Sequence, residues 1–195
     1  VGRCELPVPG VHNVLNATAA FVAALELGAS AELVLAALGR FAGVARRFEF
    51  RGEQKGVVYV DDYAHLPSEV SSVLAAAKAG NWKRVVAVFQ PHRYSRTAEL
   101  WRDFADSFVD ADHIVVTGIY GAGEVPRPGV TGDLLVRAIL DAHPSASITY
   151  LPGREEVAEY LDSNLHSGDL CLTMGAGDLT SVADEVQIRR KASDL

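Results

Sequence analysis

The sequence predicts an α/β fold, in which an N-terminal β-hairpin leads into a doubly wound, mostly parallel sheet. From residue 57 to residue 190, short apolar runs rich in β-branched residues alternate with helical stretches, as in repeated βαβ units. Hydrophobic residues make up 49% and charged residues 22% of the 195 residues, an ordinary globular composition. The net charge of −7 argues against a general nucleic-acid binder, because affinity for a phosphate backbone requires a basic surface.

Two short helices are expected before the sheet. Residues 1–10 contain two prolines and end in Gly, so we expect an extended entry and a turn. Ala and Leu dominate residues 12–28, which end on a C-cap glycine, and a second helix runs from Ser30 as N-cap to Phe41. Two such helices do not form a domain, so we interpret residues 1–42 as the tail of a preceding one. The sequence opens on Val rather than Met, and we expect a segment of a longer protein.

A β-hairpin is expected over residues 43–62. The alternating RRFEF (46–50) is typical of a first strand, GEQKG (52–56) of a turn, and VVYV (57–60) of the return strand. The elements expected after it are, in chain order, a helix opened by Pro67 and running to about Gly80, a strand at 85–89, a helix at 97–109, a strand at 113–117, a helix from a Thr131 cap to His143, a strand at 148–151, a helix at 153–165, a strand at 170–174 and a final helix. The long polar loop at 118–132 is of a length that is usually functional or mobile.

Polar clusters follow the strands at 57–60 and 85–89. The first cluster offers carboxylates and an imidazole, and the second an imidazole and two guanidinium groups: Asp61, Asp62 and His65, then His92, Arg93 and Arg96. A helical crossover brings the chain back, so both strands end at the same edge of the sheet, where open α/β sheets bind ligands. If the two strands are neighbours, their axes lie about 5 Å apart. We therefore expect a site for an anionic substrate, such as a phosphate, at this edge.

The residues of these clusters are not expected to act alike. Asp61 and Asp62 are adjacent in a strand, so they point to opposite faces, and one can face the crevice while the other caps or faces solvent. A lone histidine such as His65 usually packs a loop, but His92 falls just past a strand end on the same edge. The arginines that follow, three residues apart at a helix N-terminus, are unfavourable there unless an anion is present.

Residues outside the clusters leave alternatives open. Asn13 and Asn16 share one helix face. Asn13 is explained as an N-cap alone, whereas Asn16 is not, since Asn is a mediocre helix former. The Arg46–Arg47 pair fits a solvated sheet edge as well as a functional role. GAGD (175–178) follows the last strand without a G-x-G-x-x-G pattern, so a tight βα turn is favoured over a dinucleotide loop.

The remaining candidate residues are expected to be structural. His113, His143 and His166 are interpreted as surface or packing residues, and Trp82 and Trp101 as partial core. The two cysteines, Cys4 and Cys171, lack metal-type spacing, and we expect both to be small buried thiols, which fits a reducing cytoplasm. No apolar run approaches the roughly 20 residues of a membrane helix, no signal peptide opens the chain, and no P-loop pattern occurs.

Five motifs resemble the C-terminal part of the Mur ligase family. In chain order they are LPVPGVHNVLNATAA, RRFEF, DDYAHLPSEV, FQPHRYSRT and IYGAGEVPRPG. The resemblance covers essentially the whole chain, and the combination of DDYAH-x-P with FQPHRY-x-R is specific. Family members have a UDP-sugar domain, a central P-loop ATPase domain and a Rossmann-like C-terminal domain. The resemblance implies that residues 1–42 end the central ATP-binding domain and that residues 43–195 form the Rossmann-like domain, which accounts for the missing P-loop.

The resemblance also implies roles at matching positions. Asn13 and Asn16 would lie beside the adenine of ATP, Arg47 would reach its phosphates, and Asp62 would help to hold the nucleotide at the domain interface. Mg²⁺ would be bound mainly by the domain outside this chain, so no metal ligand is expected here.

A second set of residues is implied for catalysis and substrate binding. It lines the face that closes on the sugar carboxylate and the amino acid, with catalysis assigned to the last four: Tyr63, His65, His92, Arg93 and Arg96. Leu66 stands where the family usually has a second consecutive histidine, so only the His65 imidazole of that pair carries over.

The activity implied by the resemblance is ATP-dependent amide formation in cell-wall precursor synthesis. A muramyl carboxylate becomes an acyl phosphate, an amine attacks it, and either histidine could orient the amine or take its proton. The PHRY-x-R loop favours members that join L-alanine to UDP-N-acetylmuramate, and this segment would be inactive alone. The alternatives are a member that recycles murein tripeptide, and a non-catalytic α/β module that binds a nucleotide or a partner.

Overall fold

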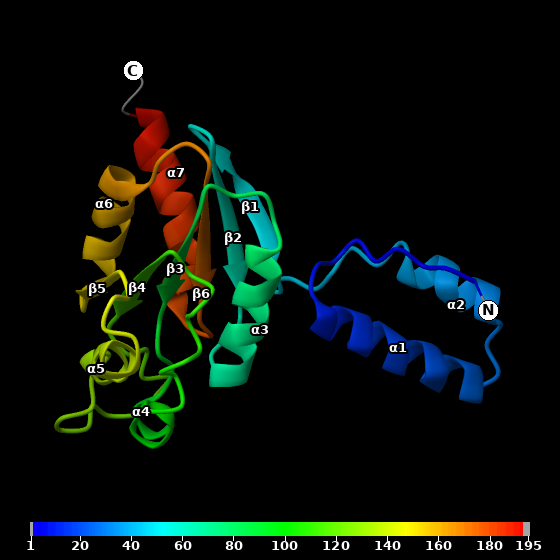
Figure 1. Ribbon diagram of the computed structural model, residues 1–195, viewed down its shortest axis with the longest axis horizontal. Helices are drawn as coiled ribbons and strands as arrows, with labels where there is room; N and C mark the ends of the chain where they lie inside the picture. The colour runs from blue at the N-terminus through cyan, green and yellow to red at the C-terminus, as the bar shows by residue number, and fades with distance from the viewer. Residues whose placement is uncertain (1, 193–195) are drawn as a thin grey trace.

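A six-stranded sheet is the centre of the computed structural model, which describes residues 2–192 (Figure 1). Its order is β1-β2-β6-β3-β4-β5, with β1 and β2 antiparallel and all other neighbours parallel. The strands are β1 (Glu49–Gln54), β2 (Val57–Asp62), β3 (Arg84–Phe89), β4 (His113–Thr117), β5 (Ile148–Leu151) and β6 (Asp169–Met174). The predicted α/β class, with a mostly parallel sheet after an antiparallel hairpin, is confirmed.

Helices cover both faces of this sheet (Figure 1). The helices of the described chain are α1 (Val11–Glu26), α2 (Ala31–Leu38), α3 (Pro67–Lys78), α4 (Tyr94–Leu100), α5 (Asp133–Ala142), α6 (Arg154–Asn164), the 3₁₀ helix η1 (Asp178–Ser181) and α7 (Val182–Ala192), and those that cover the sheet come after α2. Alternate residues of β3 show why both faces are covered, because Val85 and Phe89 pack in the core with α3 and α5, while Val86 packs in the core with α6 and α7. Both faces of the parallel strands are therefore apolar.

The pair α1–α2 lies beside the sheet rather than on it (Figure 1). α1 contacts α2 and α3, and neither α1 nor α2 contains a buried residue. Residues 2–10, before α1, contain neither helix nor strand and bend at residues 7, 8 and 10. Cys171 is buried but Cys4 is only half-buried, so the expectation of two buried thiols is wrong for Cys4, and both thiols are free. Among the described residues, no helix combines the length and the apolar character needed to cross a lipid bilayer.

The hairpin differs from the expectation at both ends of its first strand. β1 begins at Glu49 rather than Arg46, because Arg46 and Phe48 adopt positive φ values of 59° and 47° that are incompatible with a strand. The turn is Lys55-Gly56 rather than residues 52–56, since β1 continues to Gln54.

Gly52 explains why the turn lies later in the chain than expected. The register shifts between Phe50 and Gly52, so the glycine marks a β-bulge within β1. Its φ is 129°, and a Cβ there would lie 2.5 Å from Oε1 of Gln187 in α7. The glycine therefore serves the close approach of α7 to the hairpin rather than a chain reversal.

Three helix boundaries also differ from the prediction. The helix expected at 97–109 is α4, which begins at Tyr94 and ends at Leu100, and residues 101–110 form tight turns such as Ser107 N–H to Phe104 O. Phe104 and Phe108 are buried against Phe89 nonetheless, so their spacing predicted burial but not helix type. The other two differences are that α2 ends at Leu38 rather than Phe41, and that α5 begins at Asp133 after Gly132 rather than a Thr131 cap.

Candidate functional site

The two predicted polar clusters meet at the carboxyl edge of the sheet. β6 lies between β2 and β3, so the strands that carry the clusters are not neighbours. The loops after β2 and β3 nevertheless bring the rings of His65 and His92 to a centroid distance of 5.7 Å. This happens because all three strands are parallel and end at the same edge, which is the ligand edge of an open α/β sheet.

The loop after β2 holds His65 in a defined orientation. Ala64 donates its backbone N–H to Asp62 Oδ1 at 2.7 Å, which tightens the turn at the strand end. The Nδ1 atom of His65 lies 2.9 Å from the carbonyl oxygen of Tyr63, and the Tyr63 ring meets the imidazole edge-on at 5.5 Å. The half-buried His65 ring is thus fixed by its own loop.

The loop after β3 holds His92 between an arginine and a tyrosine. Arg96 donates from Nη1 to His92 Nδ1 at 3.0 Å, and the Tyr120 ring stacks on the imidazole at 5.7 Å. Burial lowers the pKa of His92, and the nearby Arg96, His65 and Arg93 lower it further. A neutral imidazole is therefore favoured here.

Arg93 has a different environment from Arg96. Its φ of 71° places it in the left-handed region just before α4, and its side chain is 49% exposed with Nη1 3.8 Å from Glu124. Glu124 in turn accepts hydrogen bonds from the backbone N–H and the hydroxyl of Ser95 at 2.8 and 2.6 Å. Tyr120 and Glu124 were not among the predicted site residues; the signals for them were the length of the polar loop at 118–132 and its IYGAGEVPRPG motif.

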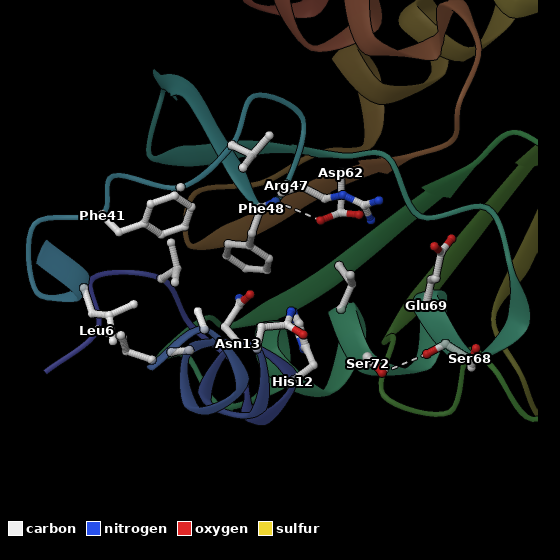
Figure 2. Close-up of a pocket in the computed structure, with 18 residues that line it drawn as sticks. Leu6, His12, Asn13, Phe41, Arg47, Phe48, Asp62, Ser68, Glu69 and Ser72 are labelled. Atoms are coloured by element: carbon white, nitrogen blue, oxygen red, sulfur yellow. Dashed lines mark hydrogen bonds between the residues drawn. The ribbon is translucent and has the colours of Figure 1, made fainter. Parts of the chain in front are cut away.

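A cavity of about 690 Å³ lies between the helix pair and the sheet (Figure 2). It brings together four residues named from the sequence, Asn13, Asn16, Arg47 and Asp62. Six of its apolar wall residues are Leu6, Val8, Ala17, Ala20, Leu38 and Phe41. The cavity thus combines an apolar wall with a few polar groups, the usual character of a small-molecule site.

The asparagines on this cavity are not explained by capping. The N-cap of α1 is Gly10, and no side chain caps the helix there, so the interpretation of Asn13 as an N-cap is wrong. Asn13 instead donates from Nδ2 to the carbonyl oxygen of Pro9 at 2.6 Å. Its amide plane is therefore held at the cavity wall by the extended segment that precedes the helix.

Asp62 lies at the other side of the cavity, and both oxygens of its carboxylate accept hydrogen bonds. Its Oδ2 accepts the backbone N–H of Phe48 at 2.8 Å (Figure 2), and its Oδ1 accepts that of Ala64 at 2.7 Å. Burial raises the pKa of Asp62 above its usual value, while these N–H groups and Arg47 oppose the rise. The carboxylate is thus partly desolvated beside a cationic neighbour.

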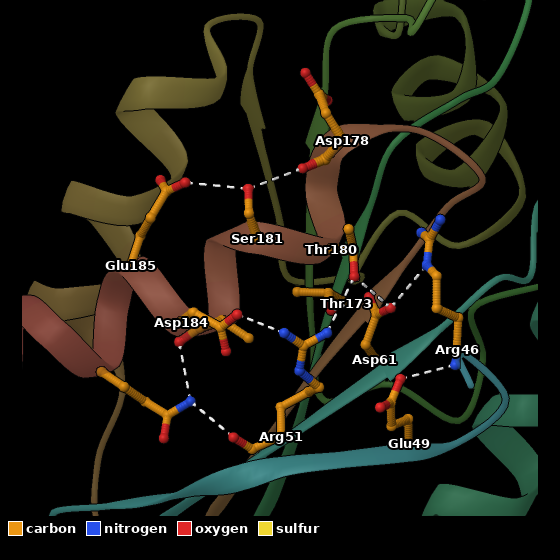
Figure 3. A network of polar contacts seen from close by, with 12 residues as sticks. Arg46, Glu49, Arg51, Asp61, Thr173, Asp178, Thr180, Ser181, Asp184 and Glu185 are labelled. Atoms are coloured by element: carbon orange, nitrogen blue, oxygen red, sulfur yellow. Dashed lines mark hydrogen bonds and ion pairs between the residues drawn. The ribbon is translucent and has the colours of Figure 1, made fainter. Parts of the chain in front are cut away.

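Arg46 and Arg47 have different environments. Arg46 is hydrogen-bonded within the protein and is not a solvated edge residue. Arg46 donates from Nε to Asp61 Oδ2 at 3.1 Å (Figure 3) and from Nη2 to the carbonyl of Gly175 at 2.6 Å. Arg47 is exposed and lines the cavity. Both guanidinium groups lie over the Tyr63 ring, at 4.9 and 5.6 Å. Tyr63 therefore lies between the cavity and the part of the carboxyl edge formed by His65, His92, Arg93 and Arg96, which we call the histidine edge.

The adjacent carboxylates Asp61 and Asp62 point to opposite faces, as expected, but Asp61 neither caps a helix nor faces solvent. It is 1% exposed and accepts the hydroxyls of Thr173 at 2.7 Å and Thr180 at 2.8 Å, besides Arg46 (Figure 3). This network joins the hairpin to the ends of β6 and η1.

The GAGD segment is a tight turn, as expected. A Cβ at Gly177 would lie 2.4 Å from Gln90 Oε1 and 2.5 Å from the Tyr120 ring, so only glycine allows the loops to pack this closely. Gln90 donates from Nε2 to Asp178 Oδ1 at 2.8 Å, which ties the loop after β3 to that after β6.

The remaining histidines lie away from this edge. The ring of His113 stacks on Tyr160, and that of His143 pairs with Asp106, while His166 contacts Arg84, as expected for packing or surface residues. Trp82 and Trp101 are partly buried against the core, as predicted. Over residues 2–192, no group of three or more His, Cys, Asp or Glu side chains is arranged to hold a metal ion.

Comparison with known proteins places this geometry in context. Residues 46–177 match the family described as "Mur ligase, glutamate ligase domain". The chain is 44% identical over 194 residues to the UDP-N-acetylmuramate–L-alanine ligase of Geobacter sp. (strain M21), covering 99% of this chain and 42% of that ligase. It is 45% identical over 190 residues to the ligase of the same name from Rubrobacter xylanophilus, covering 96% and 42%. The chain thus spans less than half the length of these relatives.

Solved structures show the same fold. The UDP-N-acetylmuramate–alanine ligase MurC of Thermotoga maritima superposes with a TM-score of 0.81 at 28% identity, over 99% of this chain and 41% of that one. The murein peptide ligase of Psychrobacter arcticus gives a TM-score of 0.72 at 25% identity, over 96% and 38%. Both alignments include the α1–α2 pair as well as the sheet.

Proposed function

The chain belongs to the Mur ligase family, and on that basis we propose that it is the C-terminal part of an ATP-dependent ligase joining L-alanine to UDP-N-acetylmuramate in peptidoglycan synthesis. The observation that carries the proposal is the 44% identity to a ligase of that name across nearly the whole chain. The proposal assigns residues 1–42 to the end of the central ATP-binding domain and residues 43–195 to the C-terminal domain.

Exposed apolar side chains on α1 support that assignment. Three apolar residues of α1 are each more than half exposed: Val14, Leu15 and Val22. No residue of this helix is buried. An apolar helix surface of this kind is stable when another part of a domain covers it. The rest of the central domain is the proposed cover.

The cavity beside α1 fits a nucleotide. Its apolar wall suits a purine ring, its asparagine amides suit hydrogen bonding to ring nitrogens, and the Arg47 guanidinium suits a phosphate. ATP would supply the phosphoryl group that converts the muramyl carboxylate to an acyl phosphate. In this chain, Asn13 and Asn16 would lie beside the base, Arg47 would reach a phosphate, and Asp62 would help to hold the nucleotide at the domain interface. Mg²⁺ would be bound mainly by the central domain, since the described residues offer no ligand cluster.

The histidine edge is proposed to bind the reacting groups. Arg93 is exposed and its Nη1 lies 3.8 Å from Glu124, so its guanidinium is accessible to a carboxylate. Arg96, Tyr63, His65 and His92 complete the face that closes on the muramyl carboxylate and the amino acid. Closure of this domain over the ATPase domain would exclude water from the acyl phosphate.

Phosphate release by the full-length protein tests the proposal. UDP-N-acetylmuramate with ATP and L-alanine should release phosphate, whereas UDP-N-acetylmuramate with the murein tripeptide should not. Release with the tripeptide alone would instead identify a murein peptide ligase, which the likeness to the Psychrobacter arcticus structure keeps as the alternative. No release with either acceptor would leave a non-catalytic binding module as the remaining function.

A further inference from the structure

The histidine edge holds two imidazoles, and amide formation needs one acceptor for the proton of the attacking amine. The rings of His65 and His92 lie 5.7 Å apart, so distance alone does not distinguish them. Their Nδ1 atoms, however, face partners of opposite character. Those partners determine which ring nitrogen carries the proton.

His65 presents a lone pair on Nε2. Its Nδ1 lies 2.9 Å from the backbone carbonyl oxygen of Tyr63, and a carbonyl oxygen can only accept a hydrogen bond. Nδ1 therefore carries the hydrogen in the neutral ring, and Nε2 is left as a base. The carboxylate of Glu69 lies 3.5 Å from the same Nδ1, where it stabilises the ring once Nε2 is protonated.

Glu69 is held in place for this contact. It belongs to the first turn of α3, and its Oε2 accepts the backbone N–H groups of His65 at 2.9 Å and Leu66 at 3.1 Å. Its side chain is only 28% exposed. The Tyr63 carbonyl orients the ring, and the Glu69 carboxylate, 3.5 Å from Nδ1, places a fixed negative charge beside it.

His92 has the opposite arrangement. Its Nδ1 lies 3.0 Å from Nη1 of Arg96, and a guanidinium can only donate. Nδ1 is therefore the acceptor, and the neutral ring carries its hydrogen on Nε2. Arg93 and Arg96 surround this ring with positive charge, opposed by Glu124, so a second proton is disfavoured.

We propose that His65 accepts the proton of the incoming amine at Nε2, that Glu69 is its positioning residue, and that His92 stays neutral and donates a hydrogen bond from Nε2–H. This inference rests on the proposed ligase function. In the step, the amine nitrogen forms a bond to the acyl carbon, and the bond from that carbon to the phosphate oxygen breaks. Phosphate leaves with the electron pair of that bond, and one nitrogen proton passes to His65.

The charged and titratable groups around each ring are few. His65 is faced by Glu69 from α3, by Tyr63 from its own loop and by His92 from the loop after β3. Around His92 are Arg93, Arg96, Tyr120 and Glu124, together with His65. Separate environments of this kind identify the acid and base members of a pair.

Nitrogen NMR of the imidazoles tests the tautomers without any enzyme assay. In this chain at about pH 8.5, where an ordinary imidazole with a pKa near 6.5 is neutral, long-range ¹H–¹⁵N spectra should show Nδ1–H for His65 and Nε2–H for His92. The reverse pattern would overturn the assignment. The expected pattern in a protein without ligase activity would reject the proposed function but not the tautomers.

Steady-state kinetics of the full-length ligase test the catalytic role. In His65→Gln, kcat should fall by about 10²- to 10⁴-fold and the ascending limb of the pH profile of kcat/KM should disappear. His92→Gln should retain that limb, because its amide still donates a hydrogen bond. His143→Gln is the matched control at a surface histidine and should keep wild-type values. Loss of the limb in His92→Gln, or its survival in His65→Gln, would exclude His65 as the base.

Glu69→Gln separates positioning from helix stabilisation. The amide oxygen can still accept the N–H groups of His65 and Leu66, but the negative charge behind the ring is gone. The value of kcat should fall, although the nitrogen spectra should still show Nδ1–H for His65, because the Tyr63 carbonyl that holds this tautomer is unchanged. Glu156→Gln is the control, because Glu156 accepts the N–H of Gly153 at the start of α6 in the same way. An unchanged kcat in Glu69→Gln would remove Glu69 from the mechanism.

Discussion

The ring centroids of His65 and His92 lie 5.7 Å apart although strand β6 separates the strands that carry them. The loops after β2 and β3 reach over the end of β6, where Gly175 donates its N–H to Asp62 O and Gln90 donates its N–H to Met174 O. Close packing at Gly177 completes the arrangement. The edge is therefore a joint product of three strand ends, and its parts can be tested separately.

Asp61→Ala should destabilise the chain by about 3–5 kcal/mol, because it leaves the Arg46 guanidinium and two threonine hydroxyls without their shared buried acceptor. Urea unfolding of this chain measures the change. Asp184→Ala removes the partner of Arg51 on a carboxylate that is 46% exposed, and should cost less than about 1 kcal/mol. Equal costs would show that the Asp61 network contributes no more than a surface pair.

Arg47→Ala should weaken binding of a non-hydrolysable ATP analogue to the full-length ligase by about 10- to 100-fold, the loss expected for one charge-assisted hydrogen bond. Calorimetric titration measures this affinity. Arg47 is exposed and contacts the Tyr63 ring, so the midpoint of thermal unfolding should barely move. Arg40→Ala, at an exposed arginine that does not line the cavity, is the control. Unchanged affinity in Arg47→Ala would remove Arg47 from the nucleotide site.

Ala17→Leu should block the cavity beside α1. Ala17 lines the cavity, and leucine preserves helix propensity while adding volume to the apolar wall. Affinity for the same ATP analogue should drop at least about tenfold, equivalent to roughly 1.4 kcal/mol. Ala75→Leu places the same side chain on an exposed position of α3 outside the cavity and should leave affinity unchanged. Equal affinities in the two variants would place the nucleotide elsewhere.

His113→Gln should reduce the pH dependence of stability. Burial lowers the pKa of His113, and the nearby Arg84 lowers it further, so the unfolded chain binds the proton at a higher pH than the folded chain. Between the two pKa values the unfolded state holds more protons, and stability therefore falls as the pH drops through about 6.5. Urea unfolding at several pH values should show a smaller fall in His113→Gln than in the wild type. An identical fall would show that His113 titrates alike in both states.

Periodicity in the sequence was enough to predict the fold class and most of the parallel strands. β4 and β5 have the expected bounds, and β3 and β6 begin one residue earlier. The sequence pattern led to wrong predictions for a glycine and a polar residue that can each serve two structural roles. Gly52 is a bulge rather than part of a turn, and Asn13 is not an N-cap. The role of Gly52 is determined by the distant α7, whose Gln187 lies against it, whereas Asn13 bonds to Pro9 four residues earlier because Gly10 already occupies the N-cap position.

The sequence by itself determined which side chains follow the strands. Apolar runs alternate with helical stretches along the chain, and this order predicts a parallel sheet whose strands end at the same edge. It also indicated the family, through the combined DDYAH-x-P and FQPHRY-x-R motifs. Only the tertiary structure decided that β6 enters between β2 and β3, that Asp61 is a buried anchor, and that a cavity joins the helix pair to Asp62. It alone distinguished the two histidines, because a ring nitrogen takes its role from the hydrogen-bond partner that folding brings to it.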